Sequence, residues 1–193
     1  HALHMRGHVL RRSGQIETAI AAFEAADRAA STYFQAENVP AEYDWHYEHN
    51  LDLLGSSYRY VGRMTDAART LQRAFDHLWA NSAGPGGVGL ADRFASAWQH
   101  VAGRFNGNAN VIGYDLFNEP WPGTAFATCA NTAGCPAFDT NELASFYRRV
   151  IARIRGEDKR HLVFYEPHVL FNFGADTNLP QLQFRGLGFS FHD

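Results

Sequence analysis

A glutamate at the end of an apolar segment is the residue of this sequence best suited to acid–base chemistry. Residues 111–117 contain Val, Ile, Tyr, Leu and Phe, a composition typical of a buried strand, and the segment stops at Asn118, Glu119 and Pro120. Because proline restricts the residue before it to extended conformations, we expect Glu119 to be held in extended backbone at the carboxyl end of that strand. In a parallel barrel this end carries the chemistry, and a carboxyl partly buried among aromatic groups has a raised pKa, which suits a general acid. The alternative is a strand followed by a turn in which Glu119 caps a local group.

This glutamate belongs to a longer motif, Tyr114 to Gly123, which reads Tyr-Asp-Leu-Phe-Asn-Glu-Pro-Trp-Pro-Gly. The motif resembles the fourth strand of the family 5 glycoside hydrolases, specifically the endoglycoceramidases. The likeness continues on both sides of the motif, in residues 74–81, 84–90, 129, 134–136, 161–167 and 186–193. The resemblance implies that about residues 71–193 are related to that family.

The resemblance implies the chemistry of a retaining glycosidase, in which two carboxyl groups stand about 5–5.5 Å apart. Glu119 matches the family's acid/base, and Asn118 matches the residue that hydrogen-bonds the sugar 2-hydroxyl or the nucleophile. His192, at the end of a sixth strand, resembles the family's active-site histidine, which orients a nearby acid or a sugar hydroxyl. No metal or cofactor is needed for the acid/base step. The family's nucleophile is a glutamate on the seventh strand, which lies beyond this sequence, so we expect the 193-residue chain not to hydrolyse glycosphingolipids by itself.

A second glutamate, Glu166, also ends an apolar segment in front of a proline. The resemblance places it on the fifth strand, where the family's nucleophile does not lie, so a supporting carboxylate is favoured over a substitute nucleophile. Three further side chains, His77, Trp79 and Trp121, are expected to line the substrate cleft together with Glu166, with tryptophan stacking on sugar. The alternative for each of the three is packing in the protein interior.

The two cysteines, Cys129 and Cys135, fall in one polar loop after the first predicted strand. A disulfide between them would close a small ring, stiffen a loop that borders the cleft and indicate an oxidising compartment. We therefore expect the hydrolase half to be secreted or extracellular. A metal site at these cysteines is disfavoured because no histidine lies near them in sequence.

The elements that must position these residues alternate between helix and strand. The pattern predicts two amphipathic helices, over residues 92–105 and 141–155. It also predicts three apolar strands, over residues 111–117, 161–165 and 187–191. Such alternation predicts parallel βαβ units, with Glu119, Glu166 and His192 at one common end of the sheet. The predicted fold class is α/β, and the resemblance makes residues 76–193 the central portion (strands 4–6) of a (β/α)8 TIM barrel.

Residues 1–75 are predicted to be all-α and contain an internal repeat. Seven residues recur 48 positions later, namely Gly7, Leu10, Gly14, Ile16, Ala19, Phe23 and Ala26 as Gly55, Tyr58, Gly62, Met64, Ala67, Leu71 and Ala74. The small residues let two antiparallel helices approach closely, and Gly14 and Gly62 suit the turns between them. The pattern resembles the tetratricopeptide repeat, although its period exceeds the usual ~34 residues. Since about three copies are normally needed to bury the repeat faces, we expect further repeats before His1.

The rival function follows from this helical half. Tetratricopeptide-like repeats imply a scaffold that binds a protein or peptide partner, with the barrel segment as an inert appendage. Such repeat proteins usually work inside cells, which disagrees with the extracellular expectation for the hydrolase half. Glycan binding that depends on Glu119 would favour the hydrolase, and partner capture by residues 1–75 would favour the scaffold.

Histidines gather in the helical half of the chain. His1, His4 and His8 share one helical face, and His46 and His49 are one turn apart. Neutral imidazoles at these spacings bind a metal when they converge. Packing and hydrogen bonding are favoured, and no metal is predicted, because the sequence does not establish that the two groups meet. Aromatic residues beside them are predicted to fill the groove between helices: Tyr43, Trp45 and Tyr47.

Composition excludes other classes of function. The 193 residues are 46% hydrophobic and 19% charged, a globular composition, and the net charge of −3 gives no electrostatic basis for binding nucleic acid or an anionic membrane. No segment is apolar enough to span a bilayer. The 14% aromatic content fits a carbohydrate or lipid cleft and a large core equally well. The activity that the resemblance to endoglycoceramidases implies is cleavage of the β-glycosidic bond between an oligosaccharide and ceramide, with a glycolipid or oligosaccharide as substrate.

Overall fold

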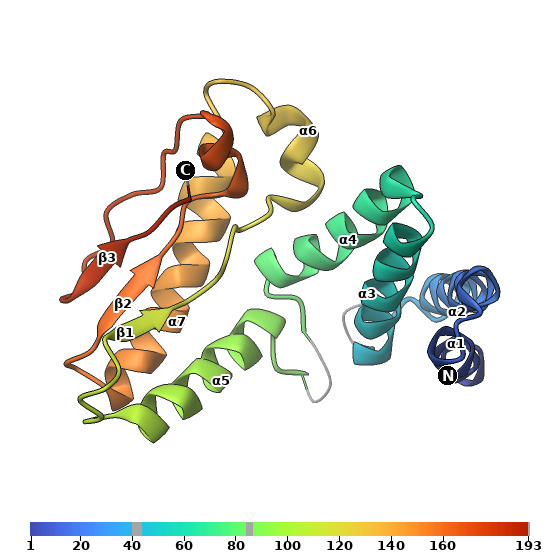
Figure 1. Ribbon diagram of the computed structural model, residues 1–193, viewed down its shortest axis with the longest axis horizontal. Coiled ribbons are helices and arrows are strands. Elements are labelled where there is room, and N and C mark those ends of the chain that lie inside the picture. The colour runs from blue at the N-terminus through green and yellow to red at the C-terminus, as the bar shows by residue number, and fades with distance from the viewer. Residues whose placement is uncertain (40–43, 84–86, 193) are drawn as a thin grey trace. The chain divides into compact units, whose positions relative to one another are not determined.

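The computed structural model describes residues 1–39, 44–83 and 87–192, which form two compact units (Figure 1). One unit comprises His1–His77 and Ser82–Val88, and the other comprises Leu78–Asn81 and Gly89–Asp193. The first is helical, and the second is mixed α/β with three parallel strands. In the described part of the chain, each helix is too short or too polar to cross a lipid bilayer. The predicted groove residue Tyr43 lies outside the described residues.

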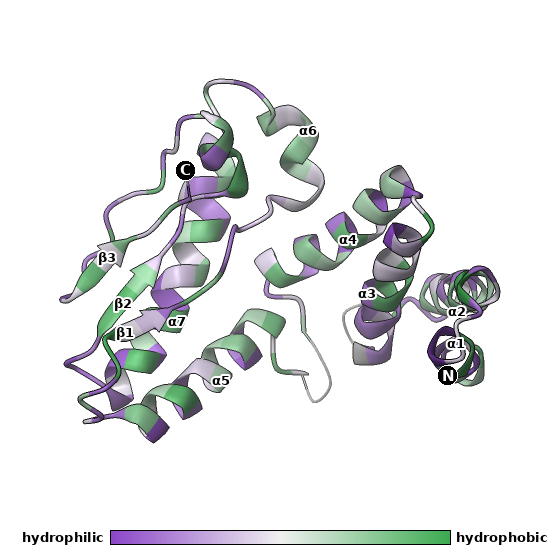
Figure 2. Ribbon diagram, in the orientation of Figure 1, coloured by the Kyte–Doolittle hydropathy of each residue, from purple (hydrophilic) through white to green (hydrophobic). Residues whose placement is uncertain are grey.

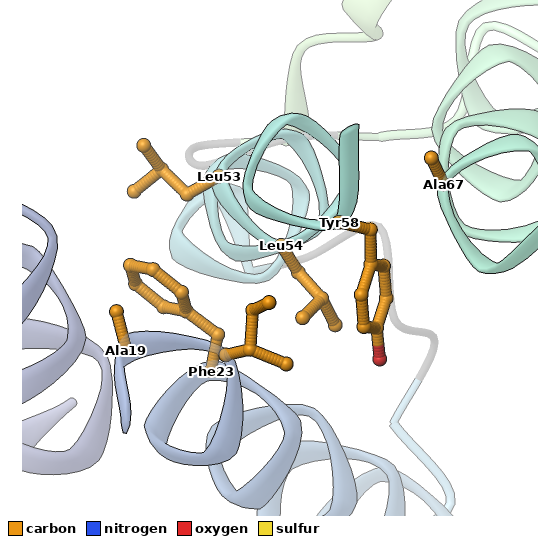
Figure 3. Close-up of a cluster of buried hydrophobic side chains, with 7 residues drawn as sticks. Ala19, Phe23, Leu53, Leu54, Tyr58 and Ala67 are labelled. Carbon is orange, nitrogen blue, oxygen red and sulfur yellow. The ribbon is translucent and has the colours of Figure 1, made fainter. Parts of the chain in front are cut away.

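The helical unit is built from antiparallel helix pairs: α1 (Ala2–Arg12), α2 (Ile16–Glu37), α3 (Trp45–Tyr60) and α4 (Met64–Trp79). The Asp44 side chain caps α3 by accepting a hydrogen bond from His46 N at 2.9 Å. Figure 3 shows side chains of α2 and α3 meeting between these helices, with Ala67 contributed by α4. The buried core consists of Ala19, Ile20, Phe23, Leu53, Leu54, Tyr58 and Ala67.

The internal repeat has a direct structural meaning. A Cβ added at Gly7 would collide with the ring of Phe23, and one added at Gly55 would lie 2.7 Å from Leu71 Cγ, so the paired glycines allow the same close approach in both helix pairs. The turn glycines match in the same way: two residues adopt left-handed φ values of +79° and +77°, namely Gly14 and Gly62. The predicted close approach and glycine turns are therefore confirmed.

Substitution of the interhelical glycines gives a first test. Gly7→Ala and Gly55→Ala are each expected to lower the free energy of unfolding by about 1–3 kcal/mol, because the added methyl group overpacks a buried contact. The matched control is Gly156 in α7 (Ala144–Glu157), where a Cβ would meet nothing within 4 Å. Gly156→Ala should stabilise the chain by about 0.5–1 kcal/mol. Urea unfolding followed by circular dichroism measures the free energy of unfolding of all three variants. Equal changes at the three positions would contradict the conclusion that Gly7 and Gly55 are needed for close helix contact.

The mixed unit contains the following elements in chain order: α5 (Leu90–Phe105), β1 (Gly113–Asp115), the 3-10 helix η3 (Gly123–Ala125), α6 (Phe126–Cys129), the π-helix η4 (Phe138–Leu143), α7 (Ala144–Glu157), β2 (Leu162–Tyr165), the 3-10 helix η5 (Val169–Phe173) and β3 (Leu187–Phe189). The strands pair in the order β1-β2-β3, and both pairings are parallel. The predicted set of adjacent parallel strands is thus confirmed. The regular strands are shorter than predicted: β1 ends at Asp115, and one further hydrogen bond follows, from Leu116 N–H to Phe164 O at 3.1 Å. Phe117 packs against Phe94 and Phe146.

The two faces of the sheet differ in character. Residues paired in register alternate between faces, so Tyr114, Val163 and Tyr165 share one face, where Tyr165 packs on Tyr147 of α7 with ring centroids 5.5 Å apart. Helix α7 lies along this face (Figure 1), and the central strand β2 is hydrophobic along its length (Figure 2). The opposite face is more open, since Asp115 of β1 is exposed there. The sheet therefore packs on α7 with one face, and the other face carries Asp115 together with Leu162 and Phe164.

A buried carboxylate braces the amino-terminal end of the sheet. Asp158 accepts hydrogen bonds from the Tyr114 hydroxyl at 2.7 Å, from Arg160 N at 2.9 Å and from the backbone and side chain of His161. Burial opposes ionisation of Asp158, but these hydrogen bonds outweigh it and hold the pKa of this carboxyl well below its usual range. This network links β1 to the turn between α7 and β2, so it fixes the parallel pairing that brings the opposite strand ends together.

Candidate active site

Three polar side chains meet at the carboxyl ends of the three strands. Glu119 follows β1, Glu166 directly follows β2, and His192 follows β3. His192 Nδ1 lies 2.9 Å from Glu119 Oε1, and His192 Nε2 lies 3.7 Å from Glu166 Oε1. The imidazole therefore stands between two carboxylates that come from two other strands.

The backbone at Glu119 differs from the prediction. Its φ is +49°, in the left-handed region, whereas the following proline had predicted an extended conformation. Hydrogen bonds on both sides hold this conformation: Glu119 N donates to Glu166 Oε2 at 2.9 Å, and Pro120 O accepts from Val169 N at 2.9 Å. A left-handed conformation costs a non-glycine residue about 1–2 kcal/mol, and such strain is concentrated at functional sites. The observed strain therefore adds to the case for a functional role of Glu119.

Glu166 is buried and fixed in place. Its side chain is 3% exposed, and the hydroxyl of Tyr147 donates to Glu166 O at 2.9 Å and accepts from Glu166 N at 3.2 Å. Burial raises the pKa of Glu166, and the nearby charge of Asp115 adds to this effect. By contrast, the Glu119 side chain is 40% exposed, which is more open than the partly buried carboxyl that was predicted. The two carboxylates therefore have different environments, as two groups with different roles require.

His192 is held against Glu119 by a residue that sequence reasoning missed. Asn172, in η5, donates from Nδ2 to Glu119 Oε1 at 3.3 Å and accepts from His192 N at 3.2 Å. The hydrogen bond to Glu119, together with the charges of Glu166 and Asp115, raises the pKa of His192. The only sequence signal for Asn172 was an amide within the apolar run Val169–Phe173.

The predicted tryptophans occupy different settings. Trp79 is 8% exposed, its indole N–H donates to Trp121 O at 2.8 Å, and its ring contacts Phe117 and Phe138. These are the packing contacts that the sequence left open as the alternative for Trp79. Trp121 is half-buried and stacks on Phe126 with ring centroids 4.2 Å apart. Trp121, which follows Glu119 and Pro120 in the sequence, therefore keeps part of its surface exposed.

Two other predicted residues lie apart from this hydrogen-bond network. Asn118 is exposed next to Glu119. His77 belongs to the helical unit, where its Nδ1 contacts Glu48 Oε1. The roles of these two residues in substrate binding stay predictions.

The loop after η3 is closed by a disulfide. Cys129, at the end of α6, is joined to Cys135, and both side chains are buried. The pairing predicted from the sequence is therefore present. The bridge constrains the segment that connects the site strand β1 to α7.

The carboxyl-end cluster on parallel strands is the arrangement expected of a barrel glycosidase. The family described as Cellulase (glycosyl hydrolase family 5) matches residues 32–193, and the chain belongs to this family. The match begins within the helical unit, and the comparisons give no support to the tetratricopeptide resemblance. That resemblance rested on small residues and turn glycines, which any closely packed helix pair requires.

Similar proteins within the family are endoglycoceramidases. Endoglycoceramidase I of Rhodococcus hoagii (strain 103S) is 33% identical over 110 residues, which cover 57% of this chain and 21% of that protein. Endoglycoceramidase of Cyanea nozakii is 32% identical over 93 residues, covering 48% of this chain and 17% of that protein. The chain thus spans about a fifth of the length of these curated relatives.

Solved structures show a partial match to the same fold. Endo-glycoceramidase II from Rhodococcus sp. in complex with ganglioside GM3 has a TM-score of 0.52 and 29% identity, covering 62% of this chain and 26% of that one. An endogalactoceramidase has a TM-score of 0.54 and 30% identity, covering 67% and 27% of the two chains. The mixed α/β unit therefore resembles part of a family 5 barrel.

Proposed function

We propose that this chain carries the acid/base part of a retaining, endoglycoceramidase-type active site, built on strands 4–6 of a (β/α)8 barrel. The observation that carries the proposal is the Glu119 carboxylate, which is held by His192 Nδ1 and Asn172 Nδ2 at the carboxyl ends of parallel strands. The proposed reaction is cleavage of the β-glycosidic bond between an oligosaccharide and ceramide. Membership of family 5 and the similarity to endoglycoceramidases support this assignment.

In the proposed mechanism Glu119 transfers its proton to the glycosidic oxygen as the bond to the sugar breaks, and it later removes a proton from the attacking water. Its half-open side chain is accessible to a substrate. His192 and Asn172 act as positioning residues, since both contact the same oxygen, Oε1, and leave Oε2 for the proton transfer. Asn118, exposed beside Glu119, is proposed to hydrogen-bond the sugar 2-hydroxyl or the nucleophile.

Glu166 is proposed to support the acid rather than to attack the sugar. Its Oε2 accepts the backbone N–H of Glu119, which holds the strained turn, and its Oε1 faces His192. A nucleophile needs an unobstructed approach to the anomeric carbon, and the Glu166 carboxylate, which is 3% exposed and accepts the Glu119 N–H through Oε2, does not have one. The attacking carboxylate of a complete site is therefore proposed to lie outside the described residues.

The proposed substrates are glycosphingolipids or their oligosaccharides. Endo-glycoceramidase II from Rhodococcus sp. has been solved with ganglioside GM3 and with a cellobiose-like imidazole, and we propose that this site recognises related ligands. Trp121, which is half-buried, is proposed to contribute to the cleft. The disulfide between Cys129 and Cys135 favours an oxidising compartment and hence a secreted location for the hydrolase part.

The arrangement around His192 gives a test of the proposed site. Because the Glu119 carboxylate stabilises the charged imidazole, Glu119→Gln is expected to lower the pKa of His192 toward its ordinary value of about 6.5. Glu166→Gln should lower it less, since Glu166 is the more distant partner. NMR titration of the histidine Cε1–H resonances measures this pKa, with the His192 signal assigned from its loss in His192→Gln. The control is Glu157→Gln, an exposed acid at the end of α7, which should leave the titration unchanged. A His192 pKa that is the same in wild type and Glu119→Gln would overturn the proposed contact.

A further inference from the structure

The histidines of the helical unit converge, which the sequence alone could not establish. His4 and His8 stand one turn apart on α1, and His49 comes from α3. One ring nitrogen from each lies within 4.8 Å of the others, and His4 Nε2 is 3.1 Å from His8 Nε2. His4 is 4% exposed, and His8 and His49 are half-buried, so the cluster extends from the interior of the helical unit to its surface.

The orientation of His4 follows from its neighbours. Asn50 Nδ2 donates to Phe23 O at 3.0 Å, which turns Asn50 Oδ1 toward His4 Nδ1 at 3.1 Å. Because Oδ1 is only an acceptor, His4 Nδ1 must carry the proton, and the lone pair of His4 is therefore on Nε2. Metal-binding histidines are typically fixed in this way, by a hydrogen bond from the nitrogen that does not bind the metal.

The spacing suits a tetrahedral transition metal. Two imidazole nitrogens bound to Zn²⁺ at about 2.0–2.1 Å in tetrahedral geometry lie about 3.3 Å apart, close to the 3.1 Å between His4 and His8. A donor set made only of imidazole suits Zn²⁺, Cu²⁺ or Ni²⁺ and not Mg²⁺ or Ca²⁺. Burial lowers the pKa of His4 and of His8, and neighbouring imidazoles lower both further, which favours the neutral, metal-binding form.

We propose that His4, His8 and His49 bind one Zn²⁺ ion that joins α1 to α3. Three protein ligands leave a fourth position for water or a further donor, and the ring of His46, 6.4 Å from that of His4, lies nearby. The bound ion cross-links two helices that are about 45 residues apart in sequence, so it stabilises the helical unit. The proposal is independent of the glycosidase site and of its chemistry.

The test uses the full chain, stripped of metal with EDTA and titrated with ZnCl2. Isothermal titration calorimetry is expected to show one saturable site per chain, and Zn²⁺ should raise Tm in a concentration-dependent way. His8→Gln and His49→Gln should each weaken binding more than about tenfold, since removing a ligand costs at least as much as removing the hydrogen-bond partner of a ligand. His100→Gln, at an exposed histidine of α5, is the matched control that should retain the site.

Co²⁺ supplies a readout that does not depend on how the variants fold. Bound in a low-coordinate site, it should give visible absorption bands in the wild-type chain, and these bands should be displaced by Zn²⁺. The absence of saturable Zn²⁺ binding by the wild-type chain would overturn the proposal. Equal binding by His8→Gln, His49→Gln and wild type, with circular dichroism showing all three folded, would overturn it as well.

Discussion

Incubation of the purified 193-residue chain with a glycosphingolipid is expected to release no oligosaccharide or ceramide above background. In the proposed mechanism Glu119 protonates the leaving group, whereas the other carboxylate that faces His192 is proposed not to attack the sugar. Glu166 is 3% exposed, and its Oε2 is already bound by Glu119 N. Loss of the nucleophile removes several orders of magnitude from the rate of a double-displacement enzyme, so the expected effect is near-complete inactivity.

Two variants make this expectation informative. Steady release of oligosaccharide that is lost in both Glu119→Gln and Glu166→Gln would contradict the supporting role of Glu166 and make it the nucleophile. Release that is lost in Glu119→Gln and retained in Glu166→Gln would contradict the expected inactivity and direct attention to Asp115, the exposed carboxylate of β1. An active endoglycoceramidase assayed in parallel verifies that the glycolipid is accessible in the detergent used.

The strands were predictable because each lies in an apolar run that ends at polar or proline-containing residues. Val163 and Tyr165 can be buried only if a helix covers their face, and the amphipathic segment that became α7 supplies that helix. Strand ends were less predictable: the apolar run continues to Phe117, whose ring packs against the distant Phe94 and Phe146, whereas regular β1 pairing ends at Asp115. Such long-range contacts do not appear in local periodicity.

The site was predictable in its residues and less so in its geometry. Glu119, Glu166 and His192 could be placed together because carboxyl ends of parallel strands meet at one edge. The left-handed backbone of Glu119 could not be read from its proline, because it is held by a hydrogen bond from Glu119 N to a carboxylate 47 residues away. Asn172 was missed for a similar reason, since its two partners are 53 and 20 residues distant.

The helical half shows the difference between a local pattern and a family. Gly7 and Gly55 correctly predicted close helix contacts, because only glycine leaves room for Phe23 and Leu71. That requirement is shared by many helix pairs, so it does not identify tetratricopeptide repeats. The histidine cluster, by contrast, could not be predicted from a local pattern. His49 meets the histidines of α1 only through the tertiary packing of α3 against the rest of the helical unit, which sequence spacing does not indicate.

The central claim, that Glu119 is the proton donor of a glycoside site, is tested most directly with a cellobiose-like imidazole. The imidazole nitrogen of such a compound takes the place of the glycosidic oxygen and accepts a proton from the acid, so binding reports on Glu119 without requiring a nucleophile. A hydrogen bond to a charged partner contributes about 1.5–3 kcal/mol, so Glu119→Gln is expected to raise Kd by about 10- to 150-fold. Glu157→Gln, which changes an exposed acid at the end of α7, should leave Kd unchanged.

Calorimetric titration of the wild-type chain, Glu119→Gln and Glu157→Gln with this compound is therefore the decisive measurement. Saturable binding by wild type and Glu157→Gln, weakened at least tenfold in Glu119→Gln, is the result that the proposed site predicts. Equal Kd values for wild type and Glu119→Gln, or no saturable binding by the folded wild-type chain, would contradict the assignment of Glu119 as the acid.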